Sequence, residues 1–323
     1  MIRYEYLDDS IQESDIHPNH LFEQEKKLAE QFVRGLHGDR ASVFSPCPVN
    51  GMLREEVLFE KWGQTYVISP GHWSVGLGQM PDASTWHTYF YDSDLAAYRA
   101  SNVYQKRVWQ LRQKLWESLM EWVEGRCIRY GHHRALRVAD WGTKFIGWRD
   151  TAMKSPFVQQ LSVIDPLPPL QEEQQDARFE AVFLMDVLQR TLDPKSLLET
   201  IHQSMEDEGL LFITTRSGTG FDILTLREQS SSVFPLEHIF LPSPSGMKQL
   251  LESTGFEVLE LSTPGLFDVD FVRSSETEIP RDQFFQRYMN SLEQEAIFER
   301  FQQFLQQNNL SSHMRVLARK KVG

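Results

Sequence analysis

The chain has 323 residues, of which 41% are hydrophobic and 24% charged, so it contains enough apolar residues for a sizeable packed core and does not have the composition of a disordered protein. Its 33 Lys and Arg are outnumbered by 45 Asp and Glu, and the formal net charge of −12 disfavours nucleic acid as a partner. No stretch approaches the ~18 apolar residues of a membrane span, and two cysteines, Cys47 and Cys127, cannot form a disulfide framework.

The N-terminal third mixes helical and strand patterns. Its first residues, MIRYEYLDDSIQESD, are acidic where a secretion signal is apolar, which predicts a cytoplasmic protein. Apolar residues at a 3.6-residue period predict a helix in LFEQEKKLAEQFVRGL. The runs VLFEKW and TYVIS, separated by Gly63, predict two short strands. A long helix is expected over 94–125, with Gly125 as its stop and an aromatic face that packs on the core or on a second copy in a homodimer.

From residue 134 onwards, strand and helix signals alternate. ALRVAD, LSVID, EAVFLMDVL and GLLFITT are expected strands, and Asp193 and Gly209 are the expected start and stop signals of the helix between the last two. A further helix and the strand FEVLELSTP follow, and a helical insert over 280–309 precedes the last strand, HMRVLARK. This order predicts an α/β fold with a doubly wound, mostly parallel sheet, in which ligands bind at the carboxyl ends of the strands.

Two polar positions follow the first strands of this sheet. Asp140-Trp141-Gly142-Thr143 ends the first strand, and Asp165 ends the second, 23 residues after Gly142. A glycine at this point allows a ligand to approach the backbone closely, and an acid about 20 residues later can accept hydrogen bonds from two ribose hydroxyls. An ordinary strand-to-helix turn explains the same residues, because a full G-x-G-x-x-G motif is absent.

The second half of the chain resembles a known enzyme family. The run FEAVFLMDVLQRTLDPKSLLETIHQSMEDEGLLFITT, followed by EHIFLPSPSGMKQLLESTGFEVLELSTPG, is similar to the class I S-adenosylmethionine-dependent methyltransferases. The C-terminal stretch from FDVDFV to SSHMRVLARK resembles the subgroup of sugar and polysaccharide biosynthesis. The resemblance implies S-adenosylmethionine as cofactor, a Rossmann-like domain over 134–323, and a small-molecule or glycan acceptor such as a sugar nucleotide or polysaccharide precursor.

The resemblance also implies a zinc ribbon before the catalytic domain. Cys47-Pro48-Val49-Asn50 and Ser69-Pro70-Gly71-His72 stand where that subgroup has its two cysteine pairs. Asn50 and Ser69 replace two thiolates, and a structural zinc site needs four good ligands, so we expect a ribbon without metal. The expected segments are therefore a helical extension over 1–45, a degenerate ribbon and long helix over 46–133, and the Rossmann-like domain.

The resemblance assigns roles to individual residues. Asp140, Gly142 and Thr143 are expected at the methionine end of the cofactor and Asp165 at its ribose, while Met185 and Asp186 line the adenine or acceptor side. Glu237 and His238 occupy the position of the acid/base residues of sugar C-methyltransferases, although His238 packed in a loop explains the same dipeptide.

Together with the lost thiolates, two further departures from the family favour a competing hypothesis. The glycine-rich loop is reduced to WGTKFIG, with Lys144 and Phe145 at positions of little space. Only 17 residues lie between Asp165 and Phe183, too few for the usual helix and strand that form one wall of the adenine pocket. These changes are also those expected of a catalytically inactive binding protein that keeps the fold, so both hypotheses remain open at the level of sequence.

Overall fold

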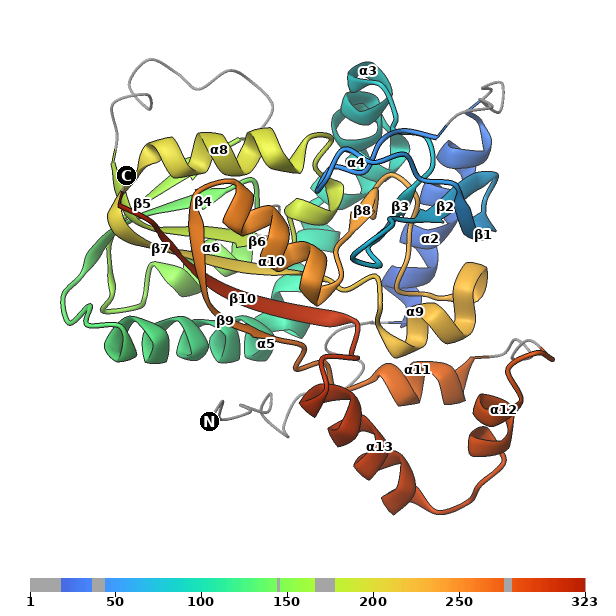
Figure 1. Ribbon diagram of the computed structural model, residues 1–323. Coiled ribbons are helices and arrows are strands. Elements are labelled where there is room, and N and C mark those ends of the chain that lie inside the picture. The colour runs from blue at the N-terminus through green and yellow to red at the C-terminus, as the bar shows by residue number, and fades with distance from the viewer. Residues whose placement is uncertain (1–18, 37–43, 144–145, 166–177, 276–280, 323) are drawn as a thin grey trace.

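The computed structural model describes residues 19–36, 44–143, 146–165, 178–275 and 281–322. Two sheets organise these residues, and the larger one has six strands in the order β5-β4-β6-β7-β10-β9 (Figure 1). Its members in chain order are β4 (Leu136–Trp141), β5 (Val158–Ile164), β6 (Phe179–Met185), β7 (Met205–Arg216), β9 (Phe256–Ser262) and β10 (His313–Lys320).

The large sheet is mostly parallel, as the sequence predicts. β4 pairs in parallel with β5 and β6, and β6 pairs in parallel with β7. Only the last strand in the sequence, β10, runs antiparallel, inserted between β7 and β9. β5 forms an edge of this sheet, and the next described strand along the chain is β6. The 166–177 part of the shortened segment lies outside the described residues.

Helices cover both faces of the large sheet, because alternate residues of its buried strands point to opposite sides. In β6, Val182 and Leu184 pack with α8 (Pro194–Ser204) and α10 (Pro244–Ser253), whereas Phe183 packs with α5 (Asn102–Arg129) and α6 (Ile146–Ala152). This two-layer covering is the doubly wound architecture (Figure 1).

The smaller sheet joins the N-terminal region to the C-terminal half. Its antiparallel order is β1-β2-β3-β8, so β8 comes from beyond residue 134 and pairs with a strand from the predicted ribbon. A separate apolar core lies between this sheet and the helix α2. Its elements are β1 (Glu56–Lys61), β2 (Gln64–Ile68), β3 (Val75–Leu77), β8 (Phe240–Leu241), α2 (Asn19–Arg34), α3 (Ala83–His87), the π-helical turn Thr88–Asp92 and α4 (Asp94–Ala100).

Three helix boundaries differ from the sequence expectation. The helix expected over 94–125 is two helices, α4 and α5, because extended Ser101 interrupts it and caps α5 by accepting a hydrogen bond from the Tyr104 amide at 3.3 Å. Gly125 does not end α5, which continues to Arg129. Gly209 is likewise not a helix stop, since α8 ends at Ser204 and Gly209 lies within β7.

A C-terminal helical group extends below the sheets in Figure 1. It consists of α9 (Phe221–Leu226), α11 (Asp268–Ser274), α12 (Phe284–Asn290) and α13 (Glu295–Gln307), and it includes the predicted helical insert.

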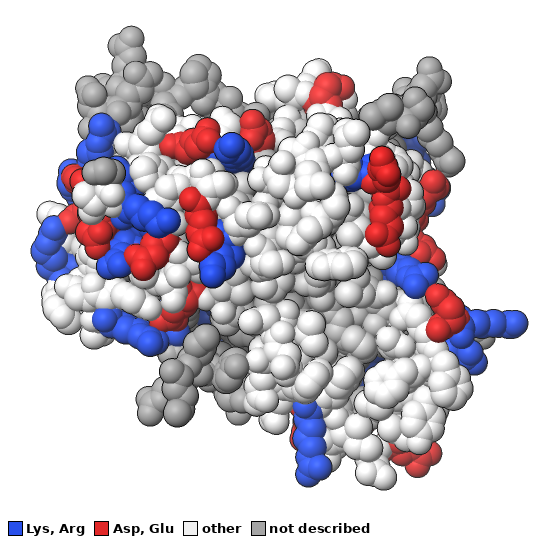
Figure 2. Space-filling model, viewed as in Figure 1, with Lys and Arg blue, Asp and Glu red and all other residues white. Residues whose placement is uncertain are grey.

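Figure 2 shows Lys and Arg mixed with Asp and Glu near the C-terminal end of β10, and no cluster of basic residues alone on that face. Within the described ranges, no helix combines the length and apolar character needed to cross a bilayer.

Gly147 allows α6 to pack closely on α5. A Cβ at this position would lie 2.0 Å from Trp116 Cζ3 and 2.5 Å from Trp109 Cδ1. We expect Gly147→Ala to lower the free energy of unfolding by about 1–3 kcal/mol through overpacking, measured by chemical denaturation. Gly125→Ala is the matched control, because its Cβ would meet nothing within 4 Å in α5, and it should raise stability by a few tenths to about 1 kcal/mol. Equal stability changes in the two variants would contradict this packing argument.

Candidate functional site

A cavity of about 1550 Å³ lies at the carboxyl ends of the parallel strands. Its lining includes Trp141 to Thr143 at the end of β4, Val163 to Asp165 at the end of β5, Asp186 after β6, and Arg216 at the end of β7. The N-terminal region supplies the opposite wall, with Glu25, Trp86, Phe90, Tyr91 and Arg99. Space for a nucleoside-sized ligand therefore exists where the sequence predicts it.

The turn after β4 depends on Gly142. Its φ is +75°, a conformation that side-chain-bearing residues adopt only at a steric cost, and its amide donates to the carbonyl of Ile164 at 2.8 Å. The Gly142 carbonyl accepts a hydrogen bond from Arg190 Nη2 at 2.7 Å. The turn is thus held from β5 and from the segment after β6. Lys144 and Phe145 lie outside the described residues.

Asp165 ends β5 with its carboxylate at the cavity. Both of its oxygens accept from the Tyr91 hydroxyl, at 3.1 and 3.2 Å. Burial, followed by the Asp165 charge, raises the pKa of Tyr91 to about 12, so the hydroxyl keeps its proton at neutral pH and acts as a donor. The Tyr91 hydroxyl therefore orients the Asp165 carboxylate at the cavity, and each carboxylate oxygen can accept more than one hydrogen bond.

Asp186, immediately after β6, also lines the cavity. Its φ of +55° turns the chain away from the sheet, and its amide donates to the carbonyl of Thr214 at 3.0 Å. The Thr214 hydroxyl donates to Asp186 Oδ1 at 3.2 Å. Thr214 of β7 thus orients the carboxylate of Asp186, which directly follows β6.

Two residues expected at the cofactor do not line the cavity. Asp140 is fully buried below the turn, where it forms an ion pair with Arg149 Nε at 2.7 Å. Burial raises the pKa of Asp140, and the contacts with Arg149 oppose that rise. Met185 is also buried, in the core formed with α5 and α6. Strand geometry explains both corrections, because residues next to each other along a strand point to opposite faces and only the strand tips reach the ligand.

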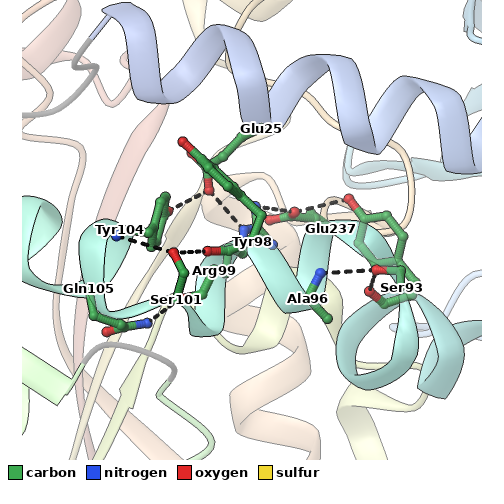
Figure 3. A network of polar contacts seen from close by, with 10 residues as sticks. Glu25, Ser93, Ala96, Tyr98, Arg99, Ser101, Tyr104, Gln105 and Glu237 are labelled. Carbon is green, nitrogen blue, oxygen red and sulfur yellow. Dashed lines mark hydrogen bonds and ion pairs between the residues drawn. The ribbon is translucent and has the colours of Figure 1, made fainter.

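Glu237 and His238 both line the cavity, but they lie in different networks. Glu237 accepts from Arg99 Nη2 at 2.6 Å and from the Tyr89 hydroxyl at 3.0 Å. Arg99 Nε is 2.8 Å from Glu25 Oε1, which also accepts from the Tyr104 hydroxyl at 2.5 Å. Figure 3 shows this chain of contacts running from α2 through α4 and α5 to Glu237. The N-terminal helix thereby fixes the position of the Glu237 carboxylate.

His238 is held as a neutral hydrogen-bond donor. Its Nδ1 accepts from the Phe234 amide at 2.9 Å, and the Phe234 carbonyl already accepts from the amides of Glu237 and His238. Nδ1 also lies 3.2 Å from the Phe234 carbonyl, but the backbone amide can only donate, which assigns the ring proton to Nε2. Burial, together with the charge of Arg216 and against the charge of Glu237, lowers the pKa of His238 to about 4. At neutral pH this side chain is uncharged, and its Nε2–H is able to donate a hydrogen bond.

The lowered pKa of His238 predicts that the free energy of unfolding decreases in mildly acidic solution. An unfolded chain binds a proton near pH 6.5 and the folded chain near pH 4, so the free energy of unfolding falls as the pH drops between these values. The loss is about 1.4 kcal/mol per unit of pKa difference. In pH-dependent denaturation, His238→Gln should lose less stability over this range than the unmodified protein. Exposed His133→Gln should change nothing, and an equal effect of both would contradict the assignment.

The sequence gives little indication of the arginines and tyrosines of the site. Arg190 lies in a short 3₁₀ turn (Leu188–Arg190), and Arg99 and Tyr91 lie in helices far along the chain from the strand tips. Tyr91 belongs to a short aromatic run, and Trp86 and Phe90 of that run also line the cavity. No local sequence pattern marks these arginines, because the residues that they contact are distant in sequence and come close only after folding.

The predicted ribbon positions are brought together outside this cavity. Cys47 Sγ lies 3.2 Å from His72 Nε2, and Asn50 Nδ2 donates to the carbonyl of Pro70 at 3.1 Å. Burial acts to raise the pKa of the Cys47 thiol, but its hydrogen bonds, led by that with His72, lower it to about 7. No cluster of three or more His, Cys, Asp or Glu in the described ranges has the arrangement of a metal site. A ribbon without metal stays a prediction.

The fold and this site define a class of protein. A doubly wound sheet with a glycine turn after one strand, an acid at the end of the next, and a cavity over both has the arrangement of enzymes that bind a nucleotide-like cofactor. A model of the methyltransferase domain family matches residues 70–261, more than half of the chain. The chain belongs to this family, and it is an S-adenosylmethionine-dependent methyltransferase.

Solved structures with related folds are distant. A plantazolicin methyltransferase in complex with S-adenosylhomocysteine has a TM-score of 0.45 at 12% identity, over 73% of this chain and 94% of that chain. A Burkholderia thailandensis 1,6-didemethyltoxoflavin-N1-methyltransferase has a TM-score of 0.42 at 11% identity, over 83% and 100%. These values are too low to indicate a substrate. No protein with a curated function matches the chain.

Proposed function

We propose that this enzyme transfers a methyl group from S-adenosylmethionine to a small-molecule or glycan acceptor, such as a sugar nucleotide or a polysaccharide precursor, in the cytoplasm. The observation that carries the proposal is the cavity over Gly142 and Asp165, at the carboxyl ends of β4 and β5. The sulfonium of the cofactor supplies an activated methyl group, so the protein needs mainly to align the acceptor and exclude water.

The residues present fit such a cofactor. Gly142 allows its methionine part to approach the backbone, and the Asp165 carboxylate accepts hydrogen bonds from ribose hydroxyls. Arg190 is a buried cation beside Gly142 whose pKa is lowered by burial, and within the described residues it has no carboxylate partner at ion-pair distance. A carboxylate of the methionine part would compensate this charge. Thr143 and Asp186 complete the neighbouring wall.

Glu237 is the proposed proton acceptor for an acceptor hydroxyl or carbon acid. Its carboxylate lies in the cavity wall and is fixed by Arg99 and Tyr89. A proton acceptor of this kind is required only when the methylated atom loses a proton during attack. The rings of Trp86 and Phe90 offer apolar faces on which a sugar can stack. The aromatic face of α5 packs on the core of this chain, and a homodimer stays a prediction.

Calorimetric titration with S-adenosylmethionine and S-adenosylhomocysteine tests this function. We expect saturable binding of both ligands, and a higher melting temperature in their presence because they bind only the folded chain. ATP is the control ligand, since it shares the adenosine but lacks the methionine part. Absence of heat and of a thermal shift at millimolar ligand would contradict the proposal and favour a binding protein that has kept the fold but lost the cofactor.

A further inference from the structure

Arg216 is placed on a rigid support at the edge of the cavity. It is the last residue of β7, and its amide donates to Gln189 Oε1 at 2.7 Å. The same oxygen accepts from the Thr215 hydroxyl at 2.9 Å, and the Gln189 side chain is buried. The backbone from which the Arg216 side chain extends is therefore fixed, and that side chain lines the cavity.

The charge of Arg216 is not compensated by a bonded partner. Two other arginines of the cavity pair with carboxylates: Arg99 with Glu25 and Glu237, and Arg149 with Asp140. In the part of the chain that the structure describes, the Arg216 guanidinium forms no hydrogen bond and has no carboxylate within 4 Å. A planar guanidinium with five donors is well matched to a carboxylate or a phosphate.

The groups around Arg216 leave its positive charge available. His238 and His313 line the cavity near it, and burial keeps both neutral at pH 7. Asp222 in α9 interacts with the charge of Arg216, but burial and the charge of Asp268 raise the pKa of Asp222 to about 6. Asp222 is fully buried, does not line the cavity, and accepts from the Ser232 hydroxyl at 2.5 Å. Asp186 faces the cavity but is held by Thr214. The His238 Nε2–H provides a second donor on this side.

Arg216 also lies apart from the proposed cofactor position. The sheet order places β7 two strands away from β4, and therefore three from β5, which corresponds to roughly 10 Å or more between strand tips. The cavity of about 1550 Å³ exceeds the ~300–1,000 Å³ of a pocket for one small ligand. A cofactor over β4 and β5 thus leaves room over β7 for a second molecule.

We propose that Arg216, with the Nε2–H of His238, binds an anionic group, phosphate or carboxylate, of the methyl acceptor. This inference rests on the proposed function and narrows its substrate class to acidic acceptors. A diphosphate is the anion of a sugar nucleotide, and a carboxylate is the anion of a uronate. Both anions would bind the Arg216 guanidinium in the same way, and they differ only in the acceptor molecule to which the anionic group belongs.

The test uses protein saturated with S-adenosylhomocysteine. Uridine 5′-diphosphate and glucuronate are titrated as anionic probes, with glucose as the neutral control. We expect at least one anionic probe to bind more tightly than glucose and to lose 10-fold or more in affinity in Arg216→Gln, with a smaller loss in Arg216→Lys, which keeps the charge but not the planar donors. Arg287→Gln, an exposed arginine of α12 outside the cavity, is the matched control and should bind like the unmodified protein.

The outcomes separate this inference from the proposed function. Tighter diphosphate binding identifies a phosphorylated acceptor, and tighter glucuronate binding identifies an acidic sugar. If neither probe binds more tightly than glucose, or if Arg216→Gln binds as the unmodified protein does, the anion site is refuted, while S-adenosylhomocysteine binding still upholds the methyltransferase. Loss of S-adenosylhomocysteine binding in Arg216→Gln would place Arg216 at the cofactor and also overturn the inference.

Discussion

Arg99→Ala is expected to lower the free energy of unfolding by about 3–5 kcal/mol, because it leaves two mostly buried carboxylates without their shared cation. The side chains of Glu25 and Glu237 are only 10% and 15% exposed, and both lie within 2.8 Å of Arg99 nitrogens. The variant should also detach α2 from the cavity wall, and methyl transfer should fall as Glu237 loses its position. Urea denaturation measures the first effect, and turnover of an accepted substrate the second.

Arg34→Ala is the matched control for this prediction. Arg34 also pairs with a glutamate, Glu30, but on the solvent-exposed side of α2, with its side chain 61% exposed. Exposed pairs of this kind contribute about 0.5 kcal/mol or less. If the two alanine variants lose similar stability, the buried network of Figure 3 is not a major contributor to the fold.

Asp165→Ala is expected to weaken S-adenosylhomocysteine binding by about 1–3 kcal/mol, or roughly 5- to 150-fold, through the loss of charged hydrogen bonds to the ribose. Tyr91→Phe should weaken it much less, because the Tyr91 hydroxyl donates to Asp165 at 3.1 Å and orients the carboxylate without itself being the acceptor. Calorimetric titration measures both effects.

Asp92→Ala controls for the removal of negative charge near this site. Asp92 adjoins Tyr91 in sequence, its side chain is 64% exposed, and it pairs with His87 at 3.1 Å. Its removal should leave affinity for S-adenosylhomocysteine unchanged. If Asp165→Ala binds S-adenosylhomocysteine as tightly as the Asp92→Ala variant does, the ribose assignment is wrong.

Local signals in the sequence predicted most of the elements and the edge of the sheet at which the cavity lies. Residues 180–185 of the run EAVFLMDVL are buried on both faces within β6, and Asp193 caps α8 by accepting from the Ser196 amide at 3.0 Å. The break at Ser101 was missed because a capping serine inside a long apolar period is a weak signal. Gly125 does not stop α5, since glycine in a helix costs only about 1 kcal/mol, which the packing of α5 outweighs.

Six of the residues expected at the site line the cavity and two do not, and the geometry of a strand explains the difference. Gly142, Thr143, Asp165, Asp186, Glu237 and His238 all line the cavity. Asp140 and Met185 do not, because a residue within a strand is directed to a packed face even when its neighbour reaches the tip. The roles given to the six lining residues stay predictions until binding is measured.

The sequence by itself determined the class of fold and the strand ends at which a ligand binds, because hydrophobic period and turn residues act over a few neighbouring positions. Its resemblance to a known family implied the methyltransferase. Only the tertiary structure decided which charges are neutralised. Arg99 meets Glu237, Arg149 meets Asp140, and Arg216 remains without a partner among the described residues. These differences depend on distances of a few ångströms between segments far apart in the chain, over which the energy of a charge changes most steeply.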